Sequence, residues 1–268
     1  MGSTVSCMIS ERTETFGSRD FEMKSDLETR LLKELEKANQ DYGLISPGDR
    51  ILLAFSGGKD SFGLFGLLGN FSEYSKIHPP IAIHPVLIDP GFPSAAWEDG
   101  ISKAQGYLSN YKSELMVEKT DIFERAHLPE NKKNPCFICS RMRRKRLFES
   151  AQRLGCQKIA FAHHRDDMIE TLLLNIFFSR EISTMIPRQE AFQGRFQIIR
   201  PLAFIEEKHL QQYAWKKGFP VIENPCPEKE ISKRRFIKEL LSELENKEPN
   251  LRHNIFHSLK NVKTDFLL

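Results

Sequence analysis

Three short segments carry residue types that could do chemistry, and the first is Ser56-Gly57-Gly58-Lys59-Asp60-Ser61, between an apolar run and a stretch of helical pattern. Two glycines let a backbone turn tightly, and free N–H groups at a helix start attract an anion. Two serine hydroxyls and the ammonium of Lys59 add donors and charge. A plain turn with a helix N-cap explains the glycines but not the whole hexapeptide. The segment is not a Walker A loop, and it predicts a site for nucleotide phosphates.

Cysteines form the second segment. The chain has five cysteines, and Cys136 and Cys139 make a Cys-x-x-Cys pair, while Cys226 lies between two prolines that display its thiol rigidly. An odd number suits a metal or redox site better than a disulfide framework. Zinc, an iron–sulfur cluster and thiol redox chemistry all remain open, and three thiolates would leave one iron of a cubane cluster open. Cys156 is expected in the core, and Cys7 has no expected role.

Histidines and aspartates form the third segment, His163-His164-Arg165-Asp166-Asp167, after the apolar strand expected at 158–162. Aspartates stabilise a helix N-terminus in any case, which accounts for one of them. Two aspartates with two histidines at the end of a strand favour a role beside the phosphate loop, where carboxylates hold Mg²⁺ on ATP. Asp89 ends another expected strand, and it either lines the same crevice or belongs to a plain turn.

The elements that position these segments alternate in type. Uninterrupted apolar runs suit parallel strands buried on both faces. Alternation of such strands with helices predicts an α/β fold with a doubly wound, mainly parallel sheet. Strands are expected at 51–55, 82–88, 115–119 and 158–162. Helices are expected at 21–38, 60–72, 96–110, 141–154, 166–178, 206–217, 232–245 and 251–262.

The expected division of the chain has four parts: a mobile tail (1–20), an N-terminal helical segment (21–45), a nucleotide-binding domain (46–225) and a C-terminal helical extension (226–268). With 40% hydrophobic and 28% charged residues, the composition excludes a low-complexity chain or a disulfide miniprotein. No apolar stretch is long enough to span a bilayer, and the N-terminus lacks a signal-peptide pattern. A cytoplasmic protein without membrane contact is therefore expected.

Basic residues gather in two runs, although the net charge is only +3. The first basic run, between residues 136 and 153, holds six bases and one acid, and the second, residues 229–238, holds five bases and one acid. Both runs flank the cysteines in the sequence, so we expect an RNA backbone to cross them, with Arg234 and Arg235 among its contacts. Solvated helix faces are the plain alternative. The six bases of the first run are Arg141, Arg143, Arg144, Lys145, Arg146 and Arg153.

Taken in order, these motifs resemble the tRNA 2-thiocytidine synthetase (TtcA) family of PP-loop ATP pyrophosphatases. The resemblance covers about residues 45–265 and includes Cys136-x-x-Cys139-Ser-Arg-x-Arg-Arg and Ile199-Arg200-Pro201-Leu202. It implies the PP-loop fold, which is adenine nucleotide alpha hydrolase-like, and an ATP-dependent enzyme that forms AMP and pyrophosphate. The implied product is 2-thiocytidine at position 32 of tRNA, made through adenylylated cytidine and cluster-bound sulfur.

The resemblance also assigns residues. It implies ATP contacts from Ser56, Gly57, Gly58, Lys59, Asp60, Ser61, Asp89 and His164, and a [4Fe-4S] cluster on Cys136, Cys139 and Cys226. It implies catalytic roles, with Mg²⁺, for Lys59, Asp60, Asp166 and Asp167, and for Lys145, because related enzymes place a lysine in the helix after Cys-x-x-Cys. A sulfur donor such as a cysteine desulfurase and a second copy of the chain are further expected partners.

The sequence around Cys226 departs from the family pattern, because a second cysteine nearby is missing and Pro225 and Pro227 frame this one. Two alternatives therefore stay open. One is a PP-loop sulfurtransferase acting on another base or a small molecule, and the other is a non-catalytic iron–sulfur protein that binds RNA.

Overall fold

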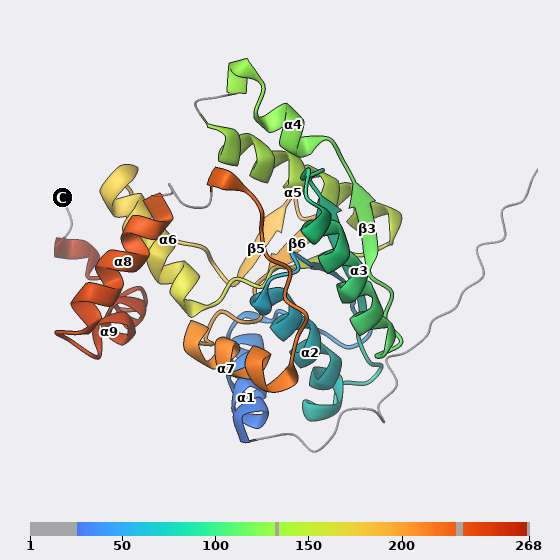
Figure 1. The fold of residues 1–268 in the computed structure, drawn as a ribbon. Coiled ribbons are helices and arrows are strands. Elements are labelled where there is room, and N and C mark those ends of the chain that lie inside the picture. The colour runs from blue at the N-terminus through green and yellow to red at the C-terminus, as the bar shows by residue number, and fades with distance from the viewer. Residues whose placement is uncertain (1–25, 132–133, 229–232, 267–268) are drawn as a thin grey trace, which may run out of the picture.

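The computed structural model describes residues 26–131, 134–228 and 233–266 (Figure 1). The expected mobile tail, Cys7 and the first four residues of the second basic run lie outside the described residues. In the described part of the chain, no helix combines the length and apolarity needed to cross a membrane.

A six-stranded sheet in the order β3-β2-β1-β4-β6-β5 forms the centre of the fold. All neighbouring strands pair in parallel except β5, which is antiparallel to β6 at the edge. This confirms the doubly wound, mainly parallel sheet. The β5–β6 hairpin was not predicted, because β5 is polar and exposed and has no apolar alternation. The strands are β1 (Arg50–Ala54), β2 (Ala82–Asp89), β3 (Met116–Lys119), β4 (Lys158–Ala160), β5 (Arg188–Ala191) and β6 (Phe196–Ile199).

Helices cover both faces of the sheet (Figure 1). Because side chains alternate along a strand, Leu53 enters the core beneath α1, α2, α3 and α7, and Leu52 enters the core beneath α4 and α5. A third group, α6, α8 and α9, packs around Ile169, Ile237 and Leu241. The helices are α1 (Asp26–Tyr42), α2 (Lys59–Tyr74), α3 (Ala95–Ser109), α4 (Ile122–Ala126), α5 (Pro135–Arg153), α6 (Arg165–Phe178), α7 (Glu207–Lys217), α8 (Lys233–Glu245) and α9 (Leu251–Ser258).

Helix α5 starts six residues earlier than the helix expected from residue 141. Pro135 occupies its first turn, where the missing N–H of proline costs no hydrogen bond. The Cys-x-x-Cys pair therefore lies on the helix itself. Residues three apart are neighbours on a helix surface, so Cys136 and Cys139 share one face of α5.

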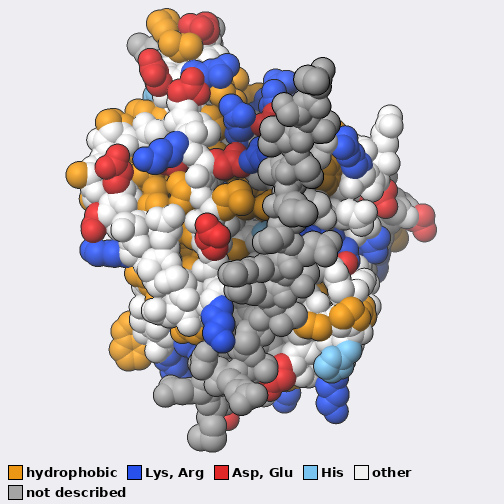
Figure 2. All heavy atoms as spheres, turned by 90° about the vertical axis from the view of Figure 1, so that its right-hand side faces the viewer, with side chains coloured by type: hydrophobic (Ala, Val, Ile, Leu, Met, Phe, Trp, Pro, Cys, Tyr) orange, Lys and Arg blue, Asp and Glu red, His pale blue; other side chains and the backbone are white. Residues whose placement is uncertain are grey.

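Buried leucines of α1 belong to the same core as β1 and α2, whereas α8 and α9 pack mainly on α6. The four-part division of the chain stays a prediction. On the face shown in Figure 2, acidic and basic side chains are interspersed among the coloured atoms, so positive charge does not gather on the part that is visible there.

Candidate active site

The phosphate loop, residues 56–61, turns the chain from β1 into α2. Gly57 has a φ of +78°, and a Cβ on it would lie 2.6 Å from the side chain of Ile222, so only glycine fits. The Ser56 Oγ accepts a hydrogen bond from the N–H of Gly58 at 3.3 Å, and the Ser61 hydroxyl donates to the Gly58 carbonyl at 2.8 Å. The hydroxyls brace the turn, while α2 begins with N–H groups that lack helical partners, as an anion site requires.

Two carboxylates hold Lys59. Its Nζ lies 2.9 Å from Asp60 Oδ1 and 3.0 Å from Glu207 Oε1. Burial disfavours the charged ammonium, but Asp60 and Glu207 outweigh burial and raise the pKa of Lys59. At Glu207 burial is likewise outweighed, by Lys59 and Lys238, and the pKa of the carboxyl falls to about 2. Glu207 was not predicted, since α7 starts 148 residues after Lys59.

The histidine and aspartate segment follows β4, the strand next to β1. The carboxyl ends of β1 and β4 flank the point where the strand order reverses, which is where ligands bind in such sheets. His164 is buried, with its Nε2 3.9 Å from Asp60 Oδ2 and 3.4 Å from Asp167 Oδ2. The structure thus brings the first and third predicted segments together at one sheet edge, where they meet through Asp60.

Both aspartates of that segment are engaged by donors of the protein. Asp166 accepts from the backbone N–H of Glu207 at 2.8 Å and from Arg252 at 3.1 Å. Asp167 accepts from the backbone N–H of His164 at 3.1 Å and from Arg234 at 2.9 Å. Each of the four carboxylate oxygens has a donor, so the pair connects α6 to α7, α8 and α9. This arrangement does not fit the expected Mg²⁺ ligation by Asp166 and Asp167.

Asp89 ends β2 and is only 7% exposed. Its Oδ1 accepts from the indole N–H of Trp97 at 2.8 Å and from the backbone N–H of Gly91 at 3.0 Å. These contacts match the turn interpretation of this residue. An ATP contact from Asp89 stays a prediction.

Cys136, Cys139 and Cys226 line one cavity of about 260 Å³. None of them forms a disulfide. Burial raises the pKa of the Cys136 and Cys139 thiols, and the proximity of Cys226 raises it further. Cys156 is separate from them: it lies in the core under α5, and burial raises its pKa to about 11.

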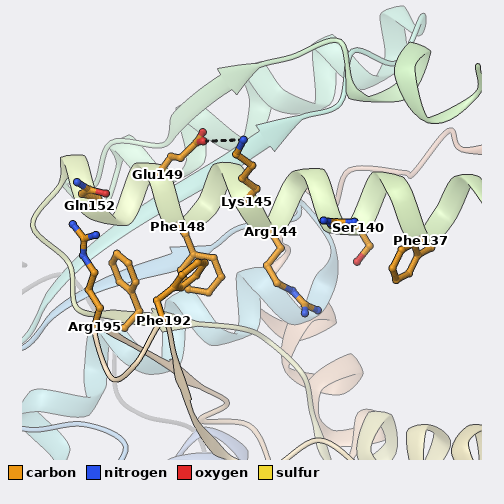
Figure 3. Close-up of a pocket in the computed structure, with 11 residues that line it drawn as sticks. Phe137, Ser140, Arg144, Lys145, Phe148, Glu149, Gln152, Phe192 and Arg195 are labelled. Atoms are coloured by element: carbon orange, nitrogen blue, oxygen red, sulfur yellow. Dashed lines mark ion pairs between the residues drawn. The ribbon is translucent and has the colours of Figure 1, made fainter. Parts of the chain in front are cut away.

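Among the described residues that line the cysteine cavity, Arg143 carries a positive charge. It lies one helical turn after Cys139, and burial lowers its pKa while Cys139 and Cys226 raise it. Lys145 projects from another side of α5, where its side chain is 77% exposed and lies 3.8 Å from Glu149 (Figure 3). The structure therefore does not bring Lys145 to the cysteines. Helix phase is the missed signal, because a residue four positions after Cys139 shares its face and one six positions after does not.

A segment outside helices and strands, residues 219–226, joins the two sites. The N–H of Ile222 donates to the Gly57 carbonyl at 2.8 Å, so the segment lies against the phosphate loop. Cys226 follows four residues later, and four residues span at most about 14 Å. The phosphate loop and the cysteine cavity are therefore neighbours.

Comparison with known proteins decides the family. The model of the PP-loop domain matches residues 23–244. The tRNA-cytidine(32) 2-sulfurtransferase of Shewanella sp. (strain W3-18-1) is 38% identical over 240 residues, which are 88% of this chain and 75% of that protein. The protein of the same name from Aeromonas hydrophila is 34% identical over 246 residues, 90% of this chain and 79% of that one. The chain belongs to the tRNA-cytidine(32) 2-sulfurtransferase family.

A solved structure shares this fold. The U34-tRNA thiolase NcsA from Methanococcus maripaludis, determined with its [4Fe-4S] cluster, matches with a TM-score of 0.71. The match covers 88% of this chain and 78% of that one, at 22% sequence identity. The likeness confirms the PP-loop fold predicted for this sulfurtransferase family member.

The donor set of the cysteine cavity fits a cluster better than a single ion. Among the described residues, no three His, Cys, Asp or Glu side chains are grouped so that they could hold one metal ion. A cubane places each protein thiolate on a different iron, so its ligands need not converge on one point. Three soft sulfur donors in one cavity with no disulfide meet that requirement.

The two basic runs of this 2-sulfurtransferase family member differ in their contacts. In the second run, Arg234 lies 2.9 Å from Asp167 and 3.0 Å from Glu170, and Lys238 lies 3.5 Å from Glu170. Arg235 pairs with Glu239 on the helix surface. The RNA contact expected from Arg234 stays a prediction, and its guanidinium is bound to acids of α6 in this structure.

Proposed function

We propose that this protein is an ATP-dependent tRNA thiolase that converts cytidine 32 into 2-thiocytidine. One observation carries the proposal: the segment held on Gly57 by Ile222 delivers Cys226 to the cavity of Cys136 and Cys139. A phosphate loop beside three thiols suits a reaction that activates an oxygen with ATP and then replaces it with sulfur. The names of the relatives supply the substrate.

In the activating step, the C2 oxygen of cytidine attacks the α-phosphorus of ATP, a P–O bond forms and pyrophosphate leaves. The N–H groups at the start of α2 and the ammonium of Lys59 offset the charge that develops on the phosphates. For this, Lys59 exchanges a carboxylate for phosphate. Glu207 stays paired when Lys59 leaves it, because Lys238 lies 3.3 Å from the same carboxylate. We assign no step to Mg²⁺.

In the second step, sulfur takes the place of the activated oxygen at C2, and AMP leaves. Cys136, Cys139 and Cys226 would hold the [4Fe-4S] cluster, which supplies an iron open to sulfur when it is bound. Burial raises the pKa of the Cys139 thiol, and the positive charge of Arg143 opposes that rise and so favours the thiolate that binds iron. The sulfur that attacks C2 is at the sulfide level, so a persulfide donor such as a cysteine desulfurase also requires a thiol reductant, which supplies two electrons and is oxidised to a disulfide.

Unpaired cations of the first basic run would bind the tRNA backbone. Arg146 and Arg153 contact Glu149 and Glu118, whereas no acidic side chain in the described residues pairs with Arg141 or Arg144. The target is a loop base, because a base in a paired stem is not accessible to attack. We place this reaction in the cytoplasm, and a homodimer remains part of the proposal.

Purified protein, reconstituted anaerobically with iron and sulfide and incubated with ATP and unmodified tRNA, tests the proposal. We expect the Cys226→Ala variant to lose both its iron and the formation of 2-thiocytidine, measured by mass spectrometry of nucleosides. Cys156→Ala is the matched control and should keep both. Full iron loading of Cys226→Ala would contradict the ligand set, and thiolation of another nucleoside would contradict the substrate.

A further inference from the structure

A groove of about 690 Å³ lies between α5 and the tip of the β5–β6 hairpin (Figure 3). Figure 3 shows Phe148 and Arg144 projecting from α5 toward the hairpin, which carries Phe192 and Arg195. The groove is separate from the cysteine cavity, but Ser140 lines both. A chain that occupies the cysteine cavity can therefore continue into the groove along α5.

The charge of the groove is positive. Arg141, Arg144 and Arg195 line it, and none of them makes an ion pair with a carboxylate in the part of the chain that the structure describes. The acid of the groove, Glu149, lies 3.8 Å from Lys145 and 3.1 Å from Arg146. Three guanidinium groups without a carboxylate partner favour a ligand that carries several negative charges. Phosphates at close spacing, as in a nucleic acid, provide such charges and accept hydrogen bonds from arginine.

Aromatic rings form the floor and rim of the groove. Phe148 and Phe196 are buried, whereas Phe192 is 64% exposed. The ring of Phe192 packs edge-on to Phe148, with centroids 4.7 Å apart and an interplanar angle of 75°. The buried rings therefore hold Phe192 in place while leaving most of it open to a ligand.

The backbone at the hairpin tip is strained. Phe192 and Gln193 have φ values of +53° and +58°, in the left-handed region that glycine and asparagine prefer in such turns. Phe192 therefore has a backbone conformation that phenylalanine disfavours, and its side chain is not buried in compensation. Strain at an exposed residue of this kind is typical of ligand contacts.

We propose that the groove binds an unpaired nucleotide of the tRNA chain that also carries the reacting cytidine. Its base stacks on Phe192, and Arg144 and Arg195 hold its phosphates. The inference depends on the proposed function, since it places a second nucleotide of the same RNA. The nucleotide is unpaired because stacking on a side chain needs an exposed base face, and any of the four bases would serve.

Anisotropy titrations of a fluorescent anticodon stem–loop RNA test this inference on the full chain. We expect Phe192→Ala to weaken binding about fivefold or more, the loss of one base–aromatic stack. Phe192→Tyr keeps the ring and should stay within about twofold of the unaltered protein. Phe266→Ala, which removes an exposed phenylalanine outside the groove, is the matched control. ATP affinity should be unchanged in all three variants.

A blunt duplex of the stem sequence is the second probe, and Phe192→Ala should not alter its binding. Unchanged stem–loop affinity in Phe192→Ala would overturn the inference. Equal losses for duplex and stem–loop would also overturn it, because they would show general phosphate binding. If Phe192→Ala instead dissociates a dimer in sedimentation without changing RNA affinity, the groove is an interface with a second copy of the chain, and the inference is overturned. If the unaltered protein itself fails to bind the stem–loop, the proposed function fails as well.

Discussion

The two basic runs look alike in the sequence and differ in the structure. On α8, Arg234 and Lys238 point inward to acids that surround the phosphate loop. On α5, Arg141 and Arg144 stay open beside the groove. The cause is what each helix packs against, since α8 packs on α6 with its acids and α5 packs on the apolar face of the sheet. A cation of a basic run is thus a candidate RNA contact only where no acidic side chain lies beside that cation.

Removing Lys59, which pairs with acids around the phosphate loop and would also bind ATP, should have the largest effect. In Lys59→Ala, we expect ATP affinity to fall about tenfold or more, because a charge-assisted hydrogen bond contributes about 1.5–3 kcal/mol. Turnover to 2-thiocytidine should fall with it, and tRNA affinity should not change. Lys145→Ala is the control, and its ATP affinity should match that of the unaltered protein. Equal ATP binding by both variants would remove Lys59 from the phosphate site.

Charge reversal should separate the two runs next. Arg234→Glu leaves Asp167 and the fully buried Glu170 without their shared cation and adds repulsion. We expect the free energy of unfolding in urea to fall by about 2–4 kcal/mol, toward the lower part of the range for buried pairs because Arg234 is 39% exposed. Arg144→Glu should change it by less than about 0.5 kcal/mol and weaken tRNA binding instead. Similar unfolding curves for both variants would contradict the comparison.

Low pH should weaken the ion pairs that Glu207 makes with Lys59 and Lys238. Its folded pKa, about 2, lies below its ordinary value of 4.5, so its ion pairs add stability above pH 4.5 and lose it as the pH falls toward 2. We expect the difference in unfolding free energy between the unaltered protein and Glu207→Gln to shrink across that window. A difference that stays constant from pH 7 to pH 3 would show that Glu207 acts by packing and not by charge.

The smallest expected effect is on the salt dependence of tRNA binding, and it concerns the first basic run. Arg141→Gln should flatten the slope of log tRNA affinity against log salt concentration by about 0.7, the value of one lost phosphate contact. Arg30→Gln serves as control, because Arg30 pairs with Glu34 on α1 and lies outside the groove. If both variants give the same slope as the unaltered protein, Arg141 is a solvated side chain.

The sequence predicts the parts of the site that depend on local order. The phosphate loop and the segment at His164 each follow a buried strand, and parallel strands carry such segments to the same edge of a sheet. The cysteine cavity was also within reach, because the Cys-x-x-Cys pair and the proline-flanked Cys226 were the three thiols considered for one cluster, while the resemblance supplied the identity of that cluster. The phosphate loop, the His164 segment and the cysteine cavity can be predicted because each is built from short motifs whose positions follow from the order of the strands.

The missed parts depend on packing between distant elements. Glu207 reaches Lys59 only because α7 packs on α2, and no pattern near either residue shows that contact. The β5–β6 hairpin has a polar edge strand, so the groove and Phe192 had no apolar signal. Arg143 was missed for a different reason: the helix was expected to begin at 141, which removed the phase that relates Arg143 to Cys139.

A single-turnover reaction tests the central claim most directly. The reconstituted protein is mixed with ATP labelled at the α-phosphate, a sulfur source and a tRNA that carries either cytidine or uridine at position 32. The account predicts one AMP formed for each 2-thiocytidine, with neither product from the uridine tRNA. Formation of 2-thiocytidine without AMP, or of AMP at the same rate from both tRNAs, would contradict it.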